Sequence, residues 1–575
     1  MMSLSSSLDS KSFSGNCMNS SSYDLIVLGS GAAGLSSAVT AAKNGLRVLV
    51  IEKDKDIGGT TAWSGGWIWS PRNLFATARG IHHEPSEVRE YLKNVTGPFF
   101  NEKRVDAFIE NAPKMVDFFH NNTSLQFQGD PGIPDTYGHQ PGAGMGGRSA
   151  IAEPFDAKLL GKHFSKLKKP LDETTFFGLM IQSGPDLKAF MSVTRSFKSM
   201  WHVGLRMTRF VFDLLRFKRS TDLRNGNALI GRLFKSAIDL GVEFKLETQV
   251  TSLIEQSGKV VGVKIVNEEI LSASGVVLAS GGYPHDKDRR EKLFVRNSEH
   301  ATLATPLATG DGAALAESVG GHFKSDTAAP AAYCPVSLVP WQSGRIGVFP
   351  HIIDRGKPGL IAVRRNGKRF CNEGLGYHDF VTDLQDQLDA DEPAKAWMIC
   401  DHRFLRRYGL GIVRPTPVPY SPWVKSGYLK EANSLEELAS QCGIDSAEFV
   451  GTVKAFNDSA AKGEDPEFGR GTTPYMRLQG DAEIQPNPCV APIVKAPFFA
   501  IEVVPGSFGT FAGIDVNAHC QVLKSDGSTV EGLYAVGTDA ASVFGGFYPA
   551  GGIAIGPALT FGYVVGNHVA GLTNA

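Results

Sequence analysis

Three glycines and a glutamate near the start of the chain could together hold a nucleotide. Gly29, Gly31 and Gly34 directly follow an apolar run that is typical of a buried parallel strand. At this spacing the first glycine permits a tight turn, the second lets backbone approach a pyrophosphate, and the third lets a helix pack against the strand. Glu52 comes 18 residues after Gly34, where a carboxylate can accept hydrogen bonds from both ribose hydroxyls and repels a 2′-phosphate. The spacing therefore predicts that the chain binds a dinucleotide.

A strand–helix–strand unit must position these residues, and the sequence predicts one. The apolar run 25–28 supplies the first strand, and the stretch up to Asn44-Gly45 is compatible with a helix. The N-terminus of that helix would direct unpaired N–H groups and a positive dipole end at the phosphates. A second glycine-rich block follows Glu52, where backbone can press against a flat ligand and hydroxyls can bind it: Gly58, Gly59, Gly65 and Gly66, with Thr60, Thr61 and Ser64.

Similar signals return far along the chain. A helix is expected at about 228–240 and a strand from Val242, with further strands in VVGVKI and GVVLASGGYP. Near the end, GLYAVGTD is typical of a strand, and a glycine pair opens a helix with Pro557 in its first turn. We therefore expect an α/β fold: a Rossmann-like dinucleotide-binding domain with a parallel sheet, split between residues 23–304 and 500–575, and an inserted α+β domain at 305–499.

The composition excludes several classes of protein. At 575 residues the chain should hold two or more domains. Lys and Arg number 58 against 59 Asp and Glu, so the overall charge indicates no nucleic-acid partner. The seven cysteines are scattered singly, without the close pairs of zinc sites or redox dithiols, which predicts no metal site and a reduced, cytoplasmic setting. No apolar run is long enough to span a membrane, and the polar, Ser-rich residues 1–22 predict a disordered tail instead of a secretory signal.

A basic and apolar segment at about 190–220 predicts a helix with two different faces. Charged or titratable side chains recur every three or four positions, which places them on one side of a helix: Arg195, Lys198, His202, Arg206, Arg209, Asp213, Arg216 and Arg219. Many of the other positions are Phe, Leu, Trp or Val. A broad apolar face beside a cationic stripe suits a helix that lies on a membrane surface. The alternative is a helix packed on the protein with a solvated basic edge.

Several longer stretches match the motifs of one known group of enzymes: GGTTAWSGGWIWSP, GGRSAIAEPFD, TGDGAALAESVG, NGKRFCNEGLGYHDFV, FGRG, GTFAG and YPAGGIAIGPALTFGY. From Tyr23 to Gly571 the chain resembles the FAD-dependent fumarate reductase and 3-ketosteroid dehydrogenase superfamily, and it is most similar to the 3-ketosteroid Δ1-dehydrogenases. The resemblance implies an FAD-binding domain with an inserted catalytic, or capping, domain. It also implies FAD held without a covalent bond, because no His aligns with the attachment residue of succinate dehydrogenases.

The FAD is expected to lie against residues from every nucleotide-binding block. These residues are Gly29, Ser30, Gly31, Ala32, Ala33, Gly34, Glu52, Lys53, Gly59, Thr60, Thr61, Ser64, Gly65, Gly66, Val250, Ala279, Gly281, Asp311, Thr538, Asp539, Gly551, Ile553 and Ala554. Thr538 and Asp539 directly follow the strand in GLYAVGTD. Which of the two side chains meets the ribityl hydroxyls stays open.

Two positions distinguish the ketosteroid branch from the fumarate reductases. Fumarate reductases carry an Arg shortly after the RF-x-NE motif as proton donor, and Tyr377 stands at that place here. Where a diacid reductase has an Arg before its last glycine pair, this chain reads FYPA at 547–550. Loss of both guanidiniums removes bidentate recognition of carboxylates, which favours a neutral carbonyl substrate.

The resemblance also implies the catalytic residues. Tyr548 and the N–H of Gly552 match the two groups that polarise a 3-keto oxygen, an oxyanion-hole arrangement. Tyr377 matches the tyrosine that acts as base, and we choose Tyr137 as its helper. The base would remove the proton alpha to the carbonyl while the beta hydrogen leaves as hydride to FAD, so that a C1–C2 double bond forms in the steroid ring.

A tyrosine base needs a special environment. A phenol with a pKa of about 10 is a poor base at neutral pH, so the site must lower the pKa of Tyr377 by hydrogen bonds or positive charge. His378 and Arg355 are the candidates for that environment.

Three functions stay open. The first is the steroid-ring dehydrogenase, with an apolar ketone as substrate, an unknown electron acceptor and peripheral contact with the inner face of the membrane. The second is a fumarate-reductase-like flavoprotein acting on another enone or unsaturated acid, which is favoured if Arg355, Arg148 or His351 line the pocket. The third is a flavin-binding protein without turnover, such as an electron carrier docked to a membrane through the helix at 190–220.

Overall fold

The computed structural model describes residues 22–130, 132–389 and 392–572. The expected disordered tail, residues 1–22, lies outside this range except for Ser22, which is the first residue of strand β1 (Ser22–Leu28). No helix in the described ranges combines the length and apolarity needed to cross a lipid bilayer.

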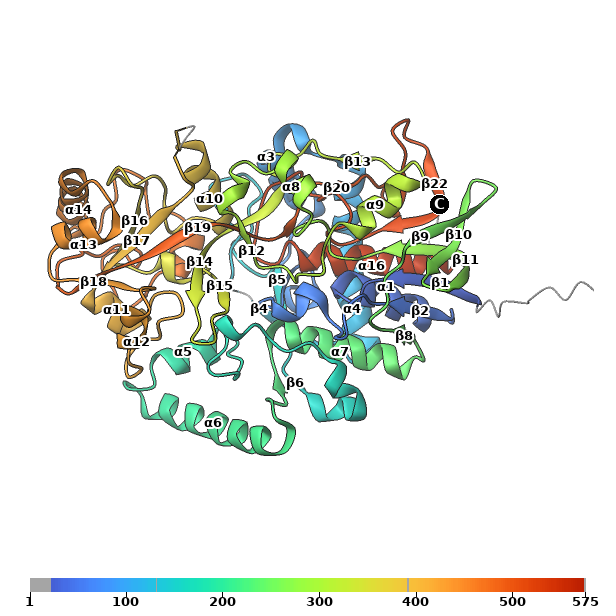
Figure 1. The fold of residues 1–575 in the computed structure, drawn as a ribbon, viewed down its shortest axis with the longest axis horizontal. Helices are drawn as coiled ribbons and strands as arrows, with labels where there is room; N and C mark the ends of the chain where they lie inside the picture. The colour runs from blue at the N-terminus through green and yellow to red at the C-terminus, as the bar shows by residue number, and fades with distance from the viewer. Residues whose placement is uncertain (1–21, 131, 390–391, 573–575) are drawn as a thin grey trace, which may run out of the picture.

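A mostly parallel sheet forms the dinucleotide-binding domain (Figure 1). Its parallel centre runs in the order β22, β11, β1, β2 and β8, so strands from the beginning, middle and end of the chain lie side by side. Antiparallel strands extend it at β9, β10 and β21. The bounds are β2 (Val48–Ile51), β8 (Glu243–Lys245), β9 (Ser252–Gln256), β10 (Lys259–Ile265), β11 (Glu268–Leu278), β21 (Gln521–Leu523) and β22 (Thr529–Ala535). The expected α/β fold with a parallel sheet, discontinuous in sequence, is confirmed.

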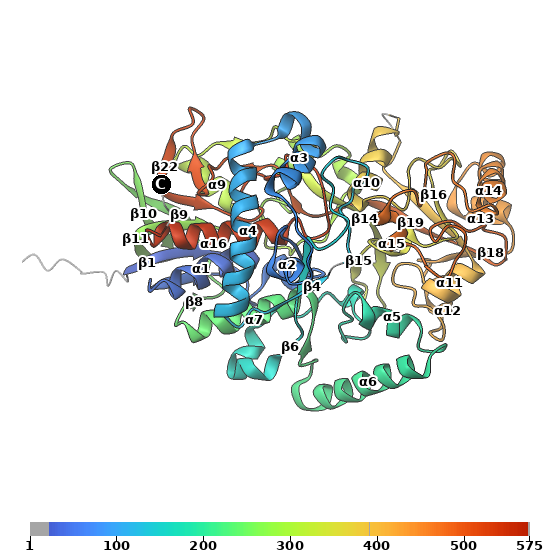
Figure 2. The same cartoon turned by 180° about the vertical axis from the view of Figure 1, so that it is seen from behind.

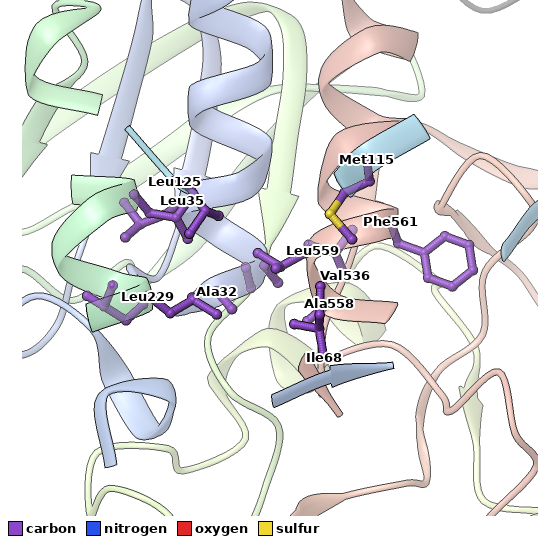
Figure 3. Close-up of a cluster of buried hydrophobic side chains, with 14 of the residues drawn as sticks. Ala32, Leu35, Ile68, Met115, Leu125, Leu229, Val536, Ala558, Leu559 and Phe561 are labelled. Atoms are coloured by element: carbon purple, nitrogen blue, oxygen red, sulfur yellow. The ribbon is translucent and has the colours of Figure 1, made fainter. Parts of the chain in front are cut away.

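The first and last helices of this domain pack closely together. Helix α1 (Ala32–Lys43) lies against α16 (Ile555–Val569) and α7 (Asn225–Asp239), close to the helices expected at these places. Figure 3 shows Leu35, Leu229 and Leu559 in one buried cluster. A Cβ at Gly562 would lie only 2.7 Å from the carbonyl oxygen of Ala33. The glycine is therefore required by the close approach of α16 to α1.

A second sheet carries the inserted domain. Its order is β15, β14, β19, β17 and β16, with β12 and β18 also paired to β19. The strands are β12 (Ala301–Thr302), β14 (Ala331–Pro340), β15 (Ile346–Pro350), β16 (Leu360–Val363), β17 (Ala396–Asp401), β18 (Lys430–Ala432) and β19 (Phe498–Thr510). The accompanying helices are α10 (Tyr377–Asp386), α11 (His402–Tyr408), α12 (Ser421–Lys425), α13 (Leu435–Cys442), α14 (Ser446–Ala460) and α15 (Pro474–Gln479).

The strand pairing differs from the expected domain limits at residues 305 and 499. Strand β19 runs through the middle of the second sheet, although most of it follows residue 499. Strand β12 pairs with β19, although it precedes residue 305. An apolar strand fits the interior of either sheet equally well, so its sequence pattern does not assign it to one of them.

The remaining helices and strands of the described chain lie outside these two sheets. The strands are β3 (Trp67–Trp69), β4 (Phe127–Asp130), β5 (Ser149–Ala152), β6 (Phe155–Asp156), β7 (Asp222–Leu223), β13 (Phe323–Lys324) and β20 (Gly513–Ile514). The helices are α2 (Leu74–Thr77), α3 (Pro85–Thr96), α4 (Glu102–Asn122), α5 (Pro185–Met191), α6 (Phe197–Phe217), α8 (Lys287–Leu293) and α9 (Asp311–Ser318).

Helix α6 lies along one edge of the molecule in both views (Figures 1 and 2). Part of its charged side faces the protein, where the buried Arg206 forms ion pairs with Asp186 and Asp222, while Lys198 and Arg216 stay exposed. Its apolar side is exposed instead: Phe197, Met200, Trp201, Leu205, Val211, Phe212, Leu214 and Leu215. The prediction that Arg206 belongs to an outward cationic stripe is wrong. Acidic residues from other parts of the chain attract this side of the helix, and the helix sequence alone does not reveal them.

Candidate active site

The glycine loop has the geometry that its spacing predicts. Gly29 has a φ of +104°, and a Cβ there would lie 2.2 Å from the carbonyl oxygen of Ala279. A Cβ at Gly34 would lie 2.0 Å from the carbonyl oxygen of Gly29, so helix and strand are in close contact. At Gly31 the nearest atom to such a Cβ is the Thr61 hydroxyl, 3.7 Å away. The open side of the loop at Gly31 therefore fits the approach of a pyrophosphate.

The carboxylate of Glu52 is fixed beside this loop. Its Oε2 accepts hydrogen bonds from the backbone N–H of Ser30 at 2.9 Å and from the Ser30 hydroxyl at 2.6 Å. Its Oε1 accepts one from the N–H of Asp54 at 2.8 Å. Each carboxylate oxygen can accept more than one hydrogen bond, so the orientation leaves capacity for ribose hydroxyls.

The remaining nucleotide-binding blocks converge on the same region. The Thr61 hydroxyl accepts a hydrogen bond from the N–H of Ala32, at the start of α1. The amine of Lys53 forms an ion pair of 2.9 Å with Asp311, at the start of α9. The hydroxyl of Thr60 accepts a hydrogen bond from the N–H of Thr305. The structure therefore brings these expected contacts together from distant parts of the chain.

Several of the expected FAD contacts lie in the second block and the middle segment. Ser64 donates a hydrogen bond to the carbonyl oxygen of Thr61 and accepts one from the N–H of Gly66. Val250 and Ala279 are buried, and Gly281 has a positive φ of 101°. At these expected contact positions, the groups offered to a ligand are mainly backbone and apolar atoms.

The side chains of Thr538 and Asp539 point to different places. Asp539 is buried, and its carboxylate accepts hydrogen bonds from the N–H groups of Ser280 and Gly282 at 2.5 and 2.8 Å. Thr538 lines a cavity together with Ile553 and Ala554, which precede α16. Thr538 is therefore the better placed of the two to meet a ribityl chain.

Two expected catalytic tyrosines are in contact. The rings of Tyr377 and Tyr548 are 4.8 Å apart at an angle of 70°, and both side chains are more than nine-tenths buried. Each phenol lies close enough to affect the pKa of the other. Tyr377 is the first residue of α10, and Tyr548 lies in the loop that leads to α16. The inserted domain and the nucleotide domain thus each contribute one tyrosine.

Tyr137 lies in the loop between β4 and β5, and this loop contacts the segment that carries Tyr548. The N–H of Thr136 donates a hydrogen bond of 2.9 Å to the carbonyl oxygen of Pro549, the residue after Tyr548. The hydroxyl of Tyr137 donates a hydrogen bond of 2.8 Å to Oδ1 of Asp379. Tyr137 is therefore beside the site, and its hydroxyl faces the first turn of α10.

Gly552 stands at a position that requires a glycine. Its φ is +94°, and a Cβ there would lie 2.6 Å from the backbone of Ile68. Its carbonyl oxygen accepts a hydrogen bond from the N–H of Trp69. Within the described part of the chain, no hydrogen bond uses the Gly552 N–H as donor. This N–H is therefore available for a ligand oxygen.

The electrostatic environment of the base differs from the prediction. Burial, followed by the neighbouring Tyr548 and Tyr475, raises the pKa of Tyr377 well above its usual value. Burial lowers the pKa of His378 to about 4, so this imidazole is neutral at neutral pH, and its Nδ1 accepts a hydrogen bond from the N–H of Tyr333. Of the two candidates for lowering the pKa of Tyr377, His378 therefore supplies no positive charge at neutral pH, because its ring is buried.

Arg355 does lie over the Tyr377 ring, with its guanidinium carbon 5.7 Å from the centroid. Its N–H groups donate to the carbonyl oxygens of His351, Glu373 and Leu375. The guanidinium is therefore near the base but is held by the backbone of the inserted domain.

The groups expected to favour an acid substrate are already bound to other protein groups. Arg148 forms an ion pair of 2.6 Å with Asp135 in the protein interior. His351 makes hydrogen bonds of 2.8 Å to both Asp354 and Ser337. Arg148 and His351 are therefore taken up by protein groups, whereas Nη2 of Arg355 is buried and has no hydrogen-bond partner among the described residues, so Arg355 keeps a donor for a substrate oxygen.

Two residues beside the tyrosines were missed by the sequence reasoning. Tyr475, on α15, is buried and lies close enough to raise the pKa values of Tyr137, Tyr377 and Tyr548. Asp379 accepts the Tyr137 hydrogen bond described above. Asp379 stands two residues after Tyr377 in the same motif, and this closeness in sequence was the signal that could have revealed it.

A Rossmann-like cradle joined to an inserted, tyrosine-bearing domain defines a flavin-dependent oxidoreductase. Residues 24–555 match the family model described as "FAD binding domain", and the chain belongs to this family. FAD is its cofactor, and the enzyme is an FAD-dependent oxidoreductase that acts on CH–CH groups.

Two curated relatives and one crystal structure cover nearly the whole chain. The chain is 40% identical to a 4-oxocyclohex-2-ene-1-carboxylate 5-dehydrogenase of Sinomonas cyclohexanicum, over 96% of this chain and 94% of the relative. It is 33% identical to a 3-oxosteroid 1-dehydrogenase of Mycolicibacterium smegmatis, over 96% and 98%. The crystal structure of a 3-ketosteroid Δ1-dehydrogenase from Sterolibacterium denitrificans, in complex with 1,4-androstadiene-3,17-dione, has a TM-score of 0.88 at 32% identity, covering 96% of this chain and all of that one.

Proposed function

We propose that the protein introduces a C1–C2 double bond into 3-ketosteroids. The observation that carries this proposal is the contact between Tyr377 and Tyr548, one from each domain, with the Gly552 N–H four residues beyond Tyr548. This set offers a proton acceptor and two hydrogen-bond donors in one enclosed place, which is what abstraction of a proton beside a ketone requires.

Each residue of the site has a different part in the proposed reaction. Tyr548 and the Gly552 N–H donate hydrogen bonds to the ketone oxygen and stabilise the negative charge that develops there, which contributes about 2.7 to 4 kcal/mol per donor in comparable sites. Tyr377 takes the proton from the carbon next to the ketone. Bound FAD supplies the hydride acceptor for the neighbouring carbon. Burial of the tyrosines excludes water and strengthens both hydrogen bonds.

A neutral ring ketone is supported by the contacts of Arg148 and His351, which both bind protein groups. Arg355 binds backbone carbonyl oxygens but keeps Nη2 without a partner among the described residues, which is the observation that favours an acid substrate instead. The similarity to 3-oxosteroid 1-dehydrogenases over nearly the full chain also supports a steroid.

A second candidate is the desaturation of 4-oxocyclohex-2-ene-1-carboxylate. The 40% identity to a dehydrogenase of this compound favours it, since that value exceeds the 33% identity to the steroid dehydrogenase. Both substrates present a ring ketone to the same tyrosine and N–H groups, so the difference would lie in what surrounds the rest of the ring.

A direct assay separates the candidates. Purified holoenzyme is mixed in parallel with 4-androstene-3,17-dione and with 4-oxocyclohex-2-ene-1-carboxylate, with a dye as electron acceptor. We expect reduction of the dye by the steroid and formation of its 1,4-diene. Turnover of the carboxylate alone would replace the first candidate by the second. Oxidation of reduced viologen by fumarate, without turnover of either ketone, would contradict both.

We further propose that α6 contacts the membrane surface, with the apolar side as the contacting side. Phe197, Trp201, Phe212 and Leu215 are exposed by 64 to 75% on one side of the helix. Lys198 and Arg216 are also exposed on the helix, where they can meet anionic headgroups. Apolar burial and charge attraction therefore both favour a lipid surface, from which an insoluble steroid would enter.

A further inference from the structure

The proton taken from the substrate must leave an enclosed site. Tyr377 is 8% exposed, and Tyr548 is 7% exposed. A proton accepted by Tyr377 therefore has no direct path to bulk water from that side chain. Each turnover nevertheless requires the base to lose its proton again.

Asp379 lies beside the site, on the first turn of the helix that begins with Tyr377. Its Oδ1 accepts the hydrogen bond from Tyr137, while its Oδ2 is sealed from solvent and has no hydrogen-bond partner among the described residues. A Cβ at Gly376, the residue before the base, would lie 2.1 Å from that Oδ2 and 3.1 Å from Thr136. The carboxylate therefore fills the space between the start of α10 and the loop that carries Tyr137.

Asp383 continues the path toward solvent. It follows Asp379 by four residues and so lies on the same side of α10, one turn further along. It is half-buried, and the next turn carries the exposed Asp386. Burial together with the two neighbouring carboxylates raises the pKa of Asp383 to about 7. Such a group both takes up and releases protons at neutral pH.

The groups that face this path come from three places. Tyr137 and Arg355 face Asp379. Burial raises the pKa of the Asp379 carboxyl. Tyr333, on the strand β14 that packs against α10, lies near Asp386. The path thus combines carboxylates with one distant cation, and the other nearby groups are neutral phenols.

We propose that Asp379 and Asp383 form a proton exit, in which the proton passes from Tyr377 through Tyr137 to Asp379, then to Asp383 and to water. In each step one O–H bond breaks and another forms. The electron pair of the broken C–H bond stays with the substrate, and bound FAD is the oxidant. Asp379 is therefore a positioning and relay residue that acts through Tyr137, and the inference rests on the proposed function.

Stopped-flow experiments on the FAD-loaded enzyme test this exit. 4-Androstene-3,17-dione is added without oxygen, and flavin bleaching is followed together with proton release to an indicator dye. Asp379→Asn should slow bleaching by about tenfold or more, the lower part of the range for losing a proton-transfer group, at unchanged FAD content and substrate affinity. Asp383→Asn should delay proton release relative to bleaching.

Two further variants separate a relay from a structural role. Asp379→Ala should regain activity when formate is added, because a small carboxylate can occupy the vacated place. Asp458→Asn makes the same chemical change at an exposed position of α14 and should react like the wild type.

The outcomes distinguish the two proposals. A wild type that is not bleached by the ketone overturns the proposed function and the exit with it. A wild type that is bleached, with Asp379→Asn equally fast or with Asp379→Ala not rescued by formate, overturns the exit alone.

Discussion

Tyr377 is the residue on which the proposed chemistry depends most. It stands where the domains meet, and its neighbours among the described residues include Tyr548, a phenol with a pKa that is raised by burial, and His378, an imidazole with a pKa that burial lowers to about 4. We expect Tyr377→Phe to lower turnover by at least about 100-fold while FAD content stays normal, because a general base contributes about 10² to 10⁴ in rate. Steady-state assays and the flavin absorbance check both parts. Near wild-type turnover of this variant would show that another residue acts as the base, and Tyr137 would be the next candidate.

The raised pKa of Tyr377 predicts the pH dependence of the rate. Only the deprotonated phenol accepts a proton, and its fraction grows about tenfold per pH unit below the pKa. Because burial raises the pKa above 10, kcat/KM should still increase between about pH 7 and about pH 9. A profile measured with constant ionic strength tests this. A rate that is flat or falls over this range would show that bound substrate or FAD lowers the pKa of the base.

The sequence predicted the tyrosines of the site better than their surroundings. Tyr377 and Tyr548 stand in motifs that match a known group, so their identities followed from the resemblance. Tyr475 lies in a different segment and reaches the site only through the packing of α15, which no local pattern encodes. The same is true of the charges: His378 is adjacent to the base in sequence, yet its enclosure, a property of the whole fold, decides that it is neutral.

At the scale of elements, α6 shows how two patterns on one helix can be misassigned. Its arginines and its apolar residues have the same helical period, so the sequence predicts the helix but not which side faces inward. Asp186 and Asp222 settle the question, and they lie outside the helix. Conversely, α1, α7 and α16 were predicted well because glycines and apolar residues mark both their ends and their buried sides.

The exposed side of α6 predicts binding to anionic vesicles. Replacement of Trp201, Phe212 and Leu215 by Ser should abolish most flotation with phosphatidylglycerol vesicles, since each exposed apolar side chain gains roughly 1.5 to 3 kcal/mol on full burial. Activity on dissolved substrate should be unchanged. The matched control replaces Val266 and Val295, which are exposed apolar residues outside α6, by Ser. Equal flotation of wild type and the triple variant would contradict a role for this surface.

At the scale of the whole molecule, buried histidines should make the fold sensitive to acid. The pKa of His378 is about 4 in the folded chain against an ordinary value of 6.5. The unfolded state therefore binds more protons between these values, so the free energy of unfolding falls as the pH drops from 6.5 to 4, by roughly 3 kcal/mol for this residue. Urea unfolding at both ends of the window measures it. His378→Gln should lose less stability across the window than the wild type, and an equal loss would contradict the assignment.

Cofactor release is the second prediction at this scale. Heat or acid should release FAD, and not FMN, into the supernatant, because the glycine loop and Glu52 are arranged for a dinucleotide. Added FAD should also raise the melting temperature, since a ligand at about 100 times its Kd stabilises the native state by about 2.7 kcal/mol. Flavin that remains with the precipitated protein would show a covalent bond.

The contact between α1 and α16 makes folding of the nucleotide domain depend on the progress of synthesis. A ribosome makes α1 long before α16, so the apolar side of α1 stays uncovered while more than 500 residues are synthesised. Tyr548, Gly552 and Ile553 emerge shortly before α16. A nascent chain stalled before residue 545 would therefore carry the glycine loop without the helix that covers it. Such a chain would expose apolar surface of the kind that chaperones bind, and it would lack the residues that α16 and its preceding loop contribute to the flavin site.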